Sequence, residues 1–220
     1  MAPTTKVRIW DVPTRLFHWT LVLLVGFSWL SSKMFWMQLH FLSGEAILAL
    51  VLFRIVWGFV GSDTARFGRF LKSPMAAVAH LKHLRRREPD TEIGHNAAGG
   101  WMALGLLVLL LLQVGTGLFS SDDEAAIEGP LRHLVAAGTS AWLTNLHGFA
   151  FTAIEIAVAG HIAAVLVYLL LKGHNLVRPM ITGTKDIPGP VAQPRMAHPA
   201  LAAGILGAAA AGVAAVLRFL

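Results

Sequence analysis

Two histidines on one long apolar stretch are the residues whose type and spacing point most directly to chemistry. His147 and His161 lie fourteen residues apart in the stretch from Trp142 to Lys172. In a helix, fourteen residues turn through roughly 1400°, about 40° short of four full turns, so both imidazoles leave the same face. They would stand about 21 Å apart along the axis, most of the thickness of a hydrocarbon layer of about 30 Å. One helix would therefore offer a strong metal ligand near each membrane surface.

Two further histidines, His18 and His40, lie in two other apolar stretches. A histidine in a membrane crossing is costly unless it is paired or ligated, and the simplest role for any single one is a hydrogen bond to a neighbouring helix. The four histidines sort into two pairs at matched depth, which favours ligation over such a bond. We expect His18 and His161 to hold the iron of one b-type haem between two imidazoles. His40 and His147 would hold the iron of a second.

The composition is typical of an integral membrane protein. Of the 220 residues 55% are hydrophobic and 14% are charged, whereas soluble domains have roughly 25% charged residues. The chain has no cysteine, which excludes disulfides, thiolate-bound iron–sulfur clusters and covalent CxxCH haem attachment. The formal net charge is +6, but Lys and Arg cluster in the loops of one membrane face, which argues against nucleic acid as a partner. The expected environment is the lipid bilayer, with histidine as the best metal ligand.

Five apolar segments are candidates to cross the bilayer, although the first reaches the needed length only if it extends through Trp36. The segments are residues 16–36, 38–60, 101–119, 142–172 and 197–220. We predict an all-α integral membrane protein, in which the first four form a four-helix transmembrane bundle that binds two b haems. The last is a fifth C-terminal transmembrane helix. The predicted domains are a haem-binding membrane domain at 1–185, and a linker with the extra helix at 186–220.

The distribution of positive charge predicts the orientation. The leader, the connection 62–94 and the linker 172–196 carry fourteen Lys and Arg residues. The opposite side carries three: Lys33, Arg132 and Arg218. By the positive-inside rule the N-terminus is cytoplasmic and, after five crossings, the C-terminus is periplasmic. Within the connection, residues 74–84 are expected to form a short interfacial helix with its basic side toward lipid phosphates.

Residues near the histidines are expected to shape the haem sites. Gly44 lies one helical turn from His40 and would leave room for a porphyrin, although tight helix packing explains this glycine equally well. Arg54 lies too deep in its segment to be an ordinary exposed residue. Its side chain therefore either extends to the membrane interface or binds an anion such as a propionate of the inner haem. His95 is expected behind a ligand or at a helix start. Glu155, expected to be buried, would transfer protons at a quinone site or bond a neighbouring helix.

Four stretches carry a family likeness: VRIWDVPTRLFHW at 7–19, LFRIVWGFVG at 52–61, GHNAAGG at 94–100, and LTNLH at 143–147 together with His161. They resemble the bacterial cytochrome b561 family, which includes the b-type subunits of nickel–iron hydrogenases. The likeness covers roughly residues 6 to 185. Its most specific parts are the opening motif and the fourteen-residue spacing of the two histidines.

The resemblance implies a dihaem membrane cytochrome, multi-pass in the bacterial inner membrane, with His18, His40, His147 and His161 as the haem ligands. It also implies electron transfer between a periplasmic partner and the quinone pool, with quinone as a substrate. The partner would be a c-type cytochrome or a redox enzyme subunit. The fifth segment departs from the four-helix core of the family and would dock a further subunit in a homo- or hetero-oligomer.

Three functions from different classes fit these features. The first is an electron-transfer cytochrome, and the second is an enzyme in its own right, a superoxide:quinone oxidoreductase, as in some members of the family. The third is a non-redox transporter or scaffold, for which the histidine pattern would be coincidence. A superoxide site needs cations beside the outer haem, whereas the loop 120–146 is acidic, with Asp122, Asp123, Glu124 and Glu128. This favours docking of a basic c-type cytochrome, and with it the first function.

Overall fold

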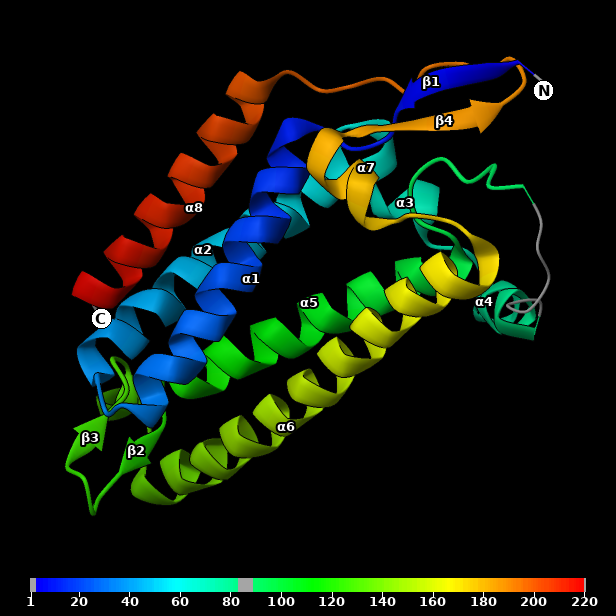
Figure 1. The fold of residues 1–220 in the computed structure, drawn as a ribbon. Helices are drawn as coiled ribbons and strands as arrows, with labels where there is room; N and C mark the ends of the chain where they lie inside the picture. The colour runs from blue at the N-terminus through cyan, green and yellow to red at the C-terminus, as the bar shows by residue number, and fades with distance from the viewer. Residues whose placement is uncertain (1–2, 83–88, 220) are drawn as a thin grey trace. The chain divides into compact units, whose positions relative to one another are not determined.

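The computed structural model describes residues 3–82 and 89–219, and most of these residues are helical. Each predicted apolar segment is a long helix (Figure 1). These helices are α1 (Val12–Lys33), α2 (Met37–Val60), α5 (Ala97–Gly117), α6 (Ala137–Val167) and α8 (Pro199–Phe219). A π-helical turn at Tyr168–Lys172 extends α6. His147 and His161 therefore lie on one helix, as their spacing predicts.

Four of the described helices are long and apolar enough to cross a membrane, namely α2, α5, α6 with its π-helical extension, and α8. Large apolar side chains on α6 point outward, such as Phe149, which is 74% exposed, and Ile156, which is 69% exposed. Outward apolar side chains are suited to lipid. Helix α1 has 22 residues, but its sequence includes Arg15 and Lys33 and it is not among the four. Its crossing, and with it a total of five spans, stays a prediction.

Helix α1 begins four residues before the predicted segment because Asp11 caps it. The Oδ1 atom of Asp11 accepts a hydrogen bond from the backbone N–H of Thr14 at 2.6 Å, an N-cap interaction. Oδ2 accepts a second bond from the indole N–H of Trp57 at 3.1 Å, which ties this helix start to the end of α2. Pro13 lies in the first turn, where its missing N–H removes no helical bond. The opening motif is therefore a helix start.

Contacts divide the chain into two compact units. Unit 1 consists of Met1–Leu16, Arg54–Gly105 and Ala157–Ala202. Unit 2 consists of Phe17–Phe53, Leu106–Ile156 and Ala203–Leu220. Unit 1 carries 15 of the 18 Lys and Arg residues and 6 of the 12 Asp and Glu residues, a formal charge of +9. Unit 2 carries the remaining 3 and 6, a formal charge of −3. The predicted domains 1–185 and 186–220 stay a prediction.

Unit 1 contains a two-stranded antiparallel sheet that sequence patterns did not predict. Strand β1 (Thr4–Arg8) pairs with β4 (Thr184–Pro188), with Val7 opposite Lys185 (Figure 1). A small core of Val7, Ile9, Trp10 and Ile187 is buried beside it. The sequence indicated only a basic leader and a proline-rich linker in these places. The sheet fixes the leader next to the short helix α7 (Val177–Thr182).

The rest of unit 1 includes the connection between α2 and α5. It forms η1 (Asp63–Ala65), α3 (Phe67–Phe70) and α4 (Pro74–Lys82). Helix α4 matches the predicted interfacial helix up to Lys82, and it exposes Met75 and Val78 three residues apart, on one face. Arg85, Arg86 and Arg87, which belong to the basic connection described from the sequence, lie outside the described residues.

Unit 2 contains the connected ends of two helical hairpins, since α1, α2, α5 and α6 each include residues of unit 1. Helices α1 and α2 are joined by a tight turn in which Phe35 has a φ of 57°, so α1 ends at Lys33 and not at Trp36. Helices α5 and α6 are joined by a longer connection that holds β2 (Ser121–Asp122), β3 (Ile127–Glu128) and η2 (Arg132–Leu134). The turn between β2 and β3 exposes the acidic side chains of Asp122, Asp123 and Glu124.

Candidate functional site

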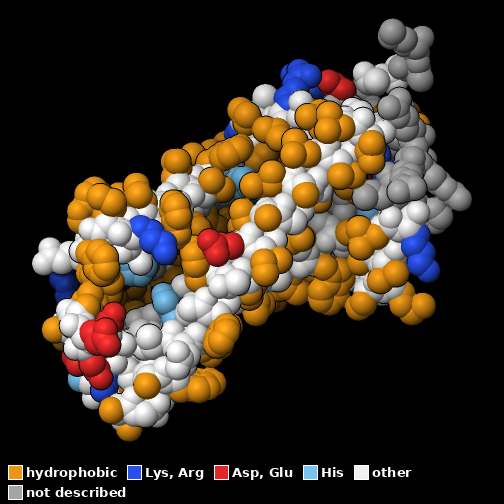
Figure 2. Space-filling model, turned by 60° about the horizontal axis from the view of Figure 1, so that its bottom comes forward, with side chains coloured by type: hydrophobic (Ala, Val, Ile, Leu, Met, Phe, Trp, Pro, Cys, Tyr) orange, Lys and Arg blue, Asp and Glu red, His pale blue; other side chains and the backbone are white. Residues whose placement is uncertain are grey.

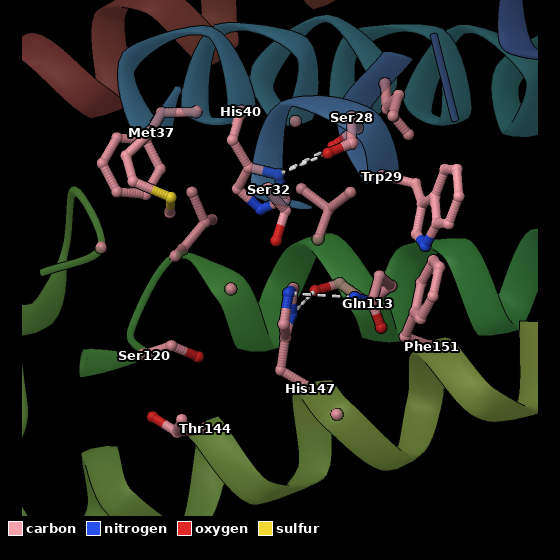
Figure 3. Close-up of a pocket in the computed structure, with 18 of the residues that line it drawn as sticks. Ser28, Trp29, Ser32, Met37, His40, Gln113, Ser120, Thr144, His147 and Phe151 are labelled. Carbon is pink, nitrogen blue, oxygen red and sulfur yellow. Dashed lines mark hydrogen bonds between the residues drawn. The ribbon is translucent and has the colours of Figure 1, made fainter. Parts of the chain in front are cut away.

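In unit 2, His40 on α2 and His147 on α6 face each other across a cavity of about 350 Å³. Figure 3 shows the two imidazoles pointing toward one another. Their ring centroids are 6.3 Å apart and their planes are inclined by 84°. Apolar side chains such as Val25, Ile47 and Phe151 line much of the wall. The structure thus brings together one of the two predicted histidine pairs.

Backbone carbonyl groups hold both imidazoles in one defined tautomer. Nδ1 of His40 lies 2.9 Å from the carbonyl oxygen of Ser28, and Nδ1 of His147 lies 2.8 Å from that of Gln113. Because a carbonyl oxygen only accepts, Nδ1 carries the hydrogen in both rings, and the lone pair is on Nε2. Metal-binding histidines are oriented in this way, through a hydrogen bond from the other ring nitrogen. Each imidazole is therefore prepared to coordinate a metal through Nε2.

Two residues beside His147 were not assigned to the site from the sequence. The side-chain Nε2 of Gln113 lies 3.0 Å from Nε2 of His147, so this amide must turn aside for a metal to bind there. A Cβ atom added to Gly117 would lie 2.8 Å from Cε1 of His147, closer than real contacts allow. Gly117 is therefore needed for the position of the ring. No spacing pattern in the sequence marks Gln113 as a neighbour of His147. Gly117 is one of several glycines in its segment, and only the packing shows that it contacts the imidazole.

The cavity has open space beside both histidines. Gly44 and Gly148 line it, and a Cβ atom at either position would meet nothing within 4 Å. Lys33 and Asp122 are also among the lining residues. Figure 2 shows a group of acidic side chains next to a hollow in which histidine side chains are visible. The cavity therefore has room for a flat ligand and an acidic neighbourhood.

His18 and His161, the other predicted pair, are each half-buried. The ring of His18, on α1 in unit 2, lies edge-on to Trp19 with centroids 4.9 Å apart. His161 lies on α6 in unit 1. Because the two histidines belong to different units, their pairing stays a prediction.

Arg54 is one of the most deeply buried charged residues that the structure describes, with 3% of its surface exposed. Nη2 donates a hydrogen bond to the carbonyl of Ala65 at 3.1 Å, and the guanidinium carbon lies 5.3 Å from the ring centroid of Phe67 and 5.9 Å from that of Phe70. Within the described residues Arg54 forms no ion pair, and Nη1 has no hydrogen-bond partner. The carboxylate of Asp11 interacts with this guanidinium electrostatically and partly compensates its buried charge. The unpaired Nη1 leaves the guanidinium able to bind a further anion.

His95 lies in one of the places expected for it, whereas Glu155 does not lie where it was expected. His95 packs between Trp10 and Phe70, with ring centroids 4.7 and 4.6 Å away. It directly precedes Asn96, whose Oδ1 caps α5, so it is at a helix start, one of its two expected places. Glu155 was expected to be buried, but it is exposed on α6. Because the neighbouring residues in the segment are apolar, the sequence does not show that the face of α6 with Glu155 points outward.

The family described as prokaryotic cytochrome b561 matches residues 9–183. The chain belongs to this family. A similar protein is the probable Ni/Fe-hydrogenase 1 B-type cytochrome subunit of Escherichia coli (strain K12), which is 25% identical over 215 residues, or 81% of this chain and 90% of the relative. The probable Ni/Fe-hydrogenase B-type cytochrome subunit of Rhizobium leguminosarum bv. viciae is also 25% identical over 215 residues, covering 83% and 85%. No solved structure gives a significant match.

Membership of the cytochrome b561 family implies b-type haem, and the apolar helices agree with it: this protein is a multi-pass membrane b-type cytochrome that transfers electrons. The family assignment speaks against the non-redox transporter or scaffold. Within the described residues no group of three or more His, Asp or Glu side chains could hold a metal ion. Haem iron needs only two ligands from the protein, because the porphyrin supplies the others.

The geometry of His40 and His147 fits such a haem. His40 and His147 would hold one iron with ring centroids about 6 Å apart, because each ring would contribute a metal–nitrogen bond of about 2 Å and the distance from that nitrogen to its ring centre. The observed distance is 6.3 Å.

Replacing Gly117 by alanine tests whether the position of His147 matters for the haem. The added Cβ would push against Cε1 of the ring, so we expect haem affinity at this site to fall about tenfold, as when the support of a metal ligand is disturbed. The haem content of the purified protein measures the effect. Gly115→Ala is the matched control, because a Cβ there meets nothing within 4 Å. Equal haem content in both variants would contradict the expected contact.

Proposed function

We propose that this cytochrome transfers electrons across the bacterial inner membrane, between a periplasmic redox partner and the quinone pool, through two bis-histidine b haems. The facing imidazoles of His40 and His147 carry the proposal, because their separation and shared tautomer suit two ligands of one iron. His18 and His161 would hold the second haem. When bound, haem supplies an iron that accepts and releases one electron at a time.

The residues around His40 and His147 would position the ligands and tune the haem. The carbonyl groups of Ser28 and Gln113 fix both rings and raise the basicity of their coordinating nitrogens. The apolar walls keep water away from the site, and burial of this kind changes reduction potentials. Gly44 would leave space for the edge of the porphyrin, which the open volume beside it supports.

Arg54 would bind an anionic group of the inner haem site. A propionate fits this role, because a guanidinium binds a carboxylate through two parallel hydrogen bonds. The deep burial of Arg54 and the spare hydrogen-bonding capacity of Nη1 support the assignment. His95 would lie behind the same site, packed against the ring of Phe70 that also faces the guanidinium.

The periplasmic partner would be a redox enzyme subunit or a c-type cytochrome. The relatives are named as B-type cytochrome subunits of Ni/Fe-hydrogenases, which supports an enzyme subunit of that kind as the electron donor. The acidic turn between β2 and β3 supports a partner with a basic surface. The exposed carboxylate of Glu155 within an apolar span supports contact with another chain, since lipid is a poor environment for it.

The proposed orientation places the N-terminus and unit 1 on the cytoplasmic side and the C-terminus on the periplasmic side. The charge of unit 1, +9 against −3 for unit 2, supports it through the positive-inside rule. Quinone would then exchange electrons with the haem held by His18 and His161. The periplasmic partner would exchange electrons with the haem held by His40 and His147.

Removing single histidines tests the number and the ligands of the haems. We expect two haems per chain in the wild type, and one in His147→Ala or His161→Ala, because each substitution removes one of two iron ligands. The ratio of haem to protein and the α-band after reduction by dithionite measure this. His133→Ala, at an exposed position outside both pairs, should keep both haems. A wild type without an α-band, or two haems in both ligand variants, would refute the assignment.

Neutralising the acidic turn tests the choice of partner. In the variant Asp123→Asn/Glu124→Gln we expect electron exchange with a basic c-type cytochrome to slow about tenfold at low ionic strength, because long-range attraction is lost. Stopped-flow absorption of the haem measures the rate, with Glu92→Gln/Asp186→Asn, at two exposed positions in unit 1, as the control of equal charge change. A wild type reduced rapidly by superoxide and not by c-type cytochrome would favour the superoxide:quinone oxidoreductase instead.

Single cysteines test the orientation without background, because the chain contains none. Asp123→Cys lies at an exposed position in unit 2 and Arg178→Cys at an exposed position in unit 1. In intact spheroplasts a membrane-impermeant maleimide should label the first and not the second. Labelling after lysis controls for reactivity. The reverse pattern would show that unit 1 faces the periplasm.

A further inference from the structure

A second cavity, of about 410 Å³, lies within unit 1 beside the start of α1. Its wall is formed by the end of β1, the first turn of α1, and residues from the two ends of the segment 182–199. The side chains of Arg8, Arg15 and His198 are among those that line it. None of these residues belongs to the predicted haem sites, so the cavity needs a separate explanation.

Hydrogen bonds hold the walls of this cavity in place. The carbonyl of Gly183 accepts bonds from the backbone N–H groups of Ile9 at 2.9 Å and Trp10 at 3.1 Å. Gly183 has a φ of +83°, and an added Cβ would meet the carbonyl oxygen of Trp10 at 2.8 Å. Nη1 of Arg15 donates to the carbonyl of Ile181. The leader and the chain after α7 therefore form one fixed frame, which holds the guanidinium of Arg15.

The charged groups of the cavity favour an anion. Nε of Arg15 is buried without a hydrogen-bond partner among the described residues. Nδ1 of His198 accepts a bond from the backbone N–H of Ala200 at 3.2 Å, which leaves Nε2 as the hydrogen-bearing, donating nitrogen. Asp11 is the one acidic residue among the described lining residues. Its carboxylate accepts two hydrogen bonds within the protein, and its negative charge is offset by the buried guanidinium of Arg54, so it opposes an anion only weakly.

We propose that this cavity binds a phosphate-bearing anion, with the phosphate held by Arg8 and Arg15. Guanidinium groups match phosphate oxygens in geometry and charge, and the exposed side chain of Arg8 is able to close over a ligand beside Arg15. The same chemistry is offered by the headgroup of an anionic phospholipid and by free phosphate. Basic pockets between transmembrane helices on the cytoplasmic side bind lipid headgroups, and unit 1 lies on that side in the proposed orientation. The cavity adjoins the start of α1, and the proposal does not depend on the haem ligands.

Binding of phosphatidylglycerol to the haem-containing, full-length protein tests the proposal. Protein in detergent is mixed with equal amounts of phosphatidylglycerol and phosphatidylcholine, and retained lipid is counted by native mass spectrometry. We expect the wild type to prefer phosphatidylglycerol, and Arg8→Gln to bind it about fivefold more weakly, the usual effect of one basic residue near a membrane surface. Arg8→Gln leaves the backbone pairing of β1 unchanged, whereas Arg15→Gln would also remove the bond to Ile181.

Arg178→Gln is the matched control. It removes the same charge from an exposed position in unit 1 that does not line the cavity, so it should keep the preference for phosphatidylglycerol. Unchanged haem absorption in both variants shows that they are folded. Equal loss of lipid in Arg8→Gln and Arg178→Gln would overturn the proposal, because it would reduce the effect to overall charge.

A separate arm distinguishes the source of the phosphate. Inorganic phosphate and glycerol 3-phosphate are added to the wild type and to Arg8→Gln, and the shift in thermal unfolding is measured. A shift in the wild type that is lost in Arg8→Gln, with displacement of phosphatidylglycerol, supports the site and identifies free phosphate as a ligand. Phosphatidylglycerol binding that neither anion displaces supports the site with a lipid as its ligand. No binding of any of these probes would overturn the proposal.

Discussion

The hydrogen bonds from Nδ1 of His40 and His147 to backbone carbonyls are the constraint on which the rest of the site depends. Each bond joins the two helices of one hairpin, α1 with α2 through Ser28 and α5 with α6 through Gln113. A helical carbonyl has a second lone pair, so it accepts the imidazole without losing its place in the helix. Both rings are therefore fixed before any ligand binds, and both histidines line one cavity, with the amide of Gln113 against Nε2 of His147. Preorganisation of this kind keeps a metal ligand in its productive rotamer.

The start of α1 and a buried charge lie close together in unit 1. Asp11 caps α1 and binds the indole of Trp57, one helical turn beyond Arg54 on α2. The guanidinium of Arg54 lies over aromatic rings that α3 supplies, and one of these rings also packs against His95. The opening motif, the second motif and the GHNAAGG motif are thus parts of a single packed cluster. Side chains of one motif therefore have their hydrogen-bond or packing partners in another motif, as Asp11 has in Trp57.

The two units differ in charge as much as in chemistry. Unit 2 combines an apolar histidine cavity with an acidic turn, whereas unit 1 combines a buried arginine with a second cavity lined by Arg8 and Arg15. Charge of one sign attracts partners of the other sign over distances near the Debye length. The acidic turn suits a basic protein surface, and the basic cavity suits an anionic headgroup or phosphate. Docking of the redox partner and binding of the phosphate-bearing anion would then use different parts of the chain.

The sequence by itself determined the long helices and the family resemblance, and it predicted which histidines would bind haem iron, because apolar length, short motifs and helical spacing are local properties of the chain. It placed His147 and His161 on one helix and singled out His40 as the partner of His147. Only the tertiary structure decided that β1 pairs with β4, that Gln113 and Gly117 contact His147, and that Glu155 points outward. These features depend on segments far apart in the sequence coming together. Strand pairing across about 180 residues, and the fit of a glycine against an imidazole, leave no periodic pattern to read.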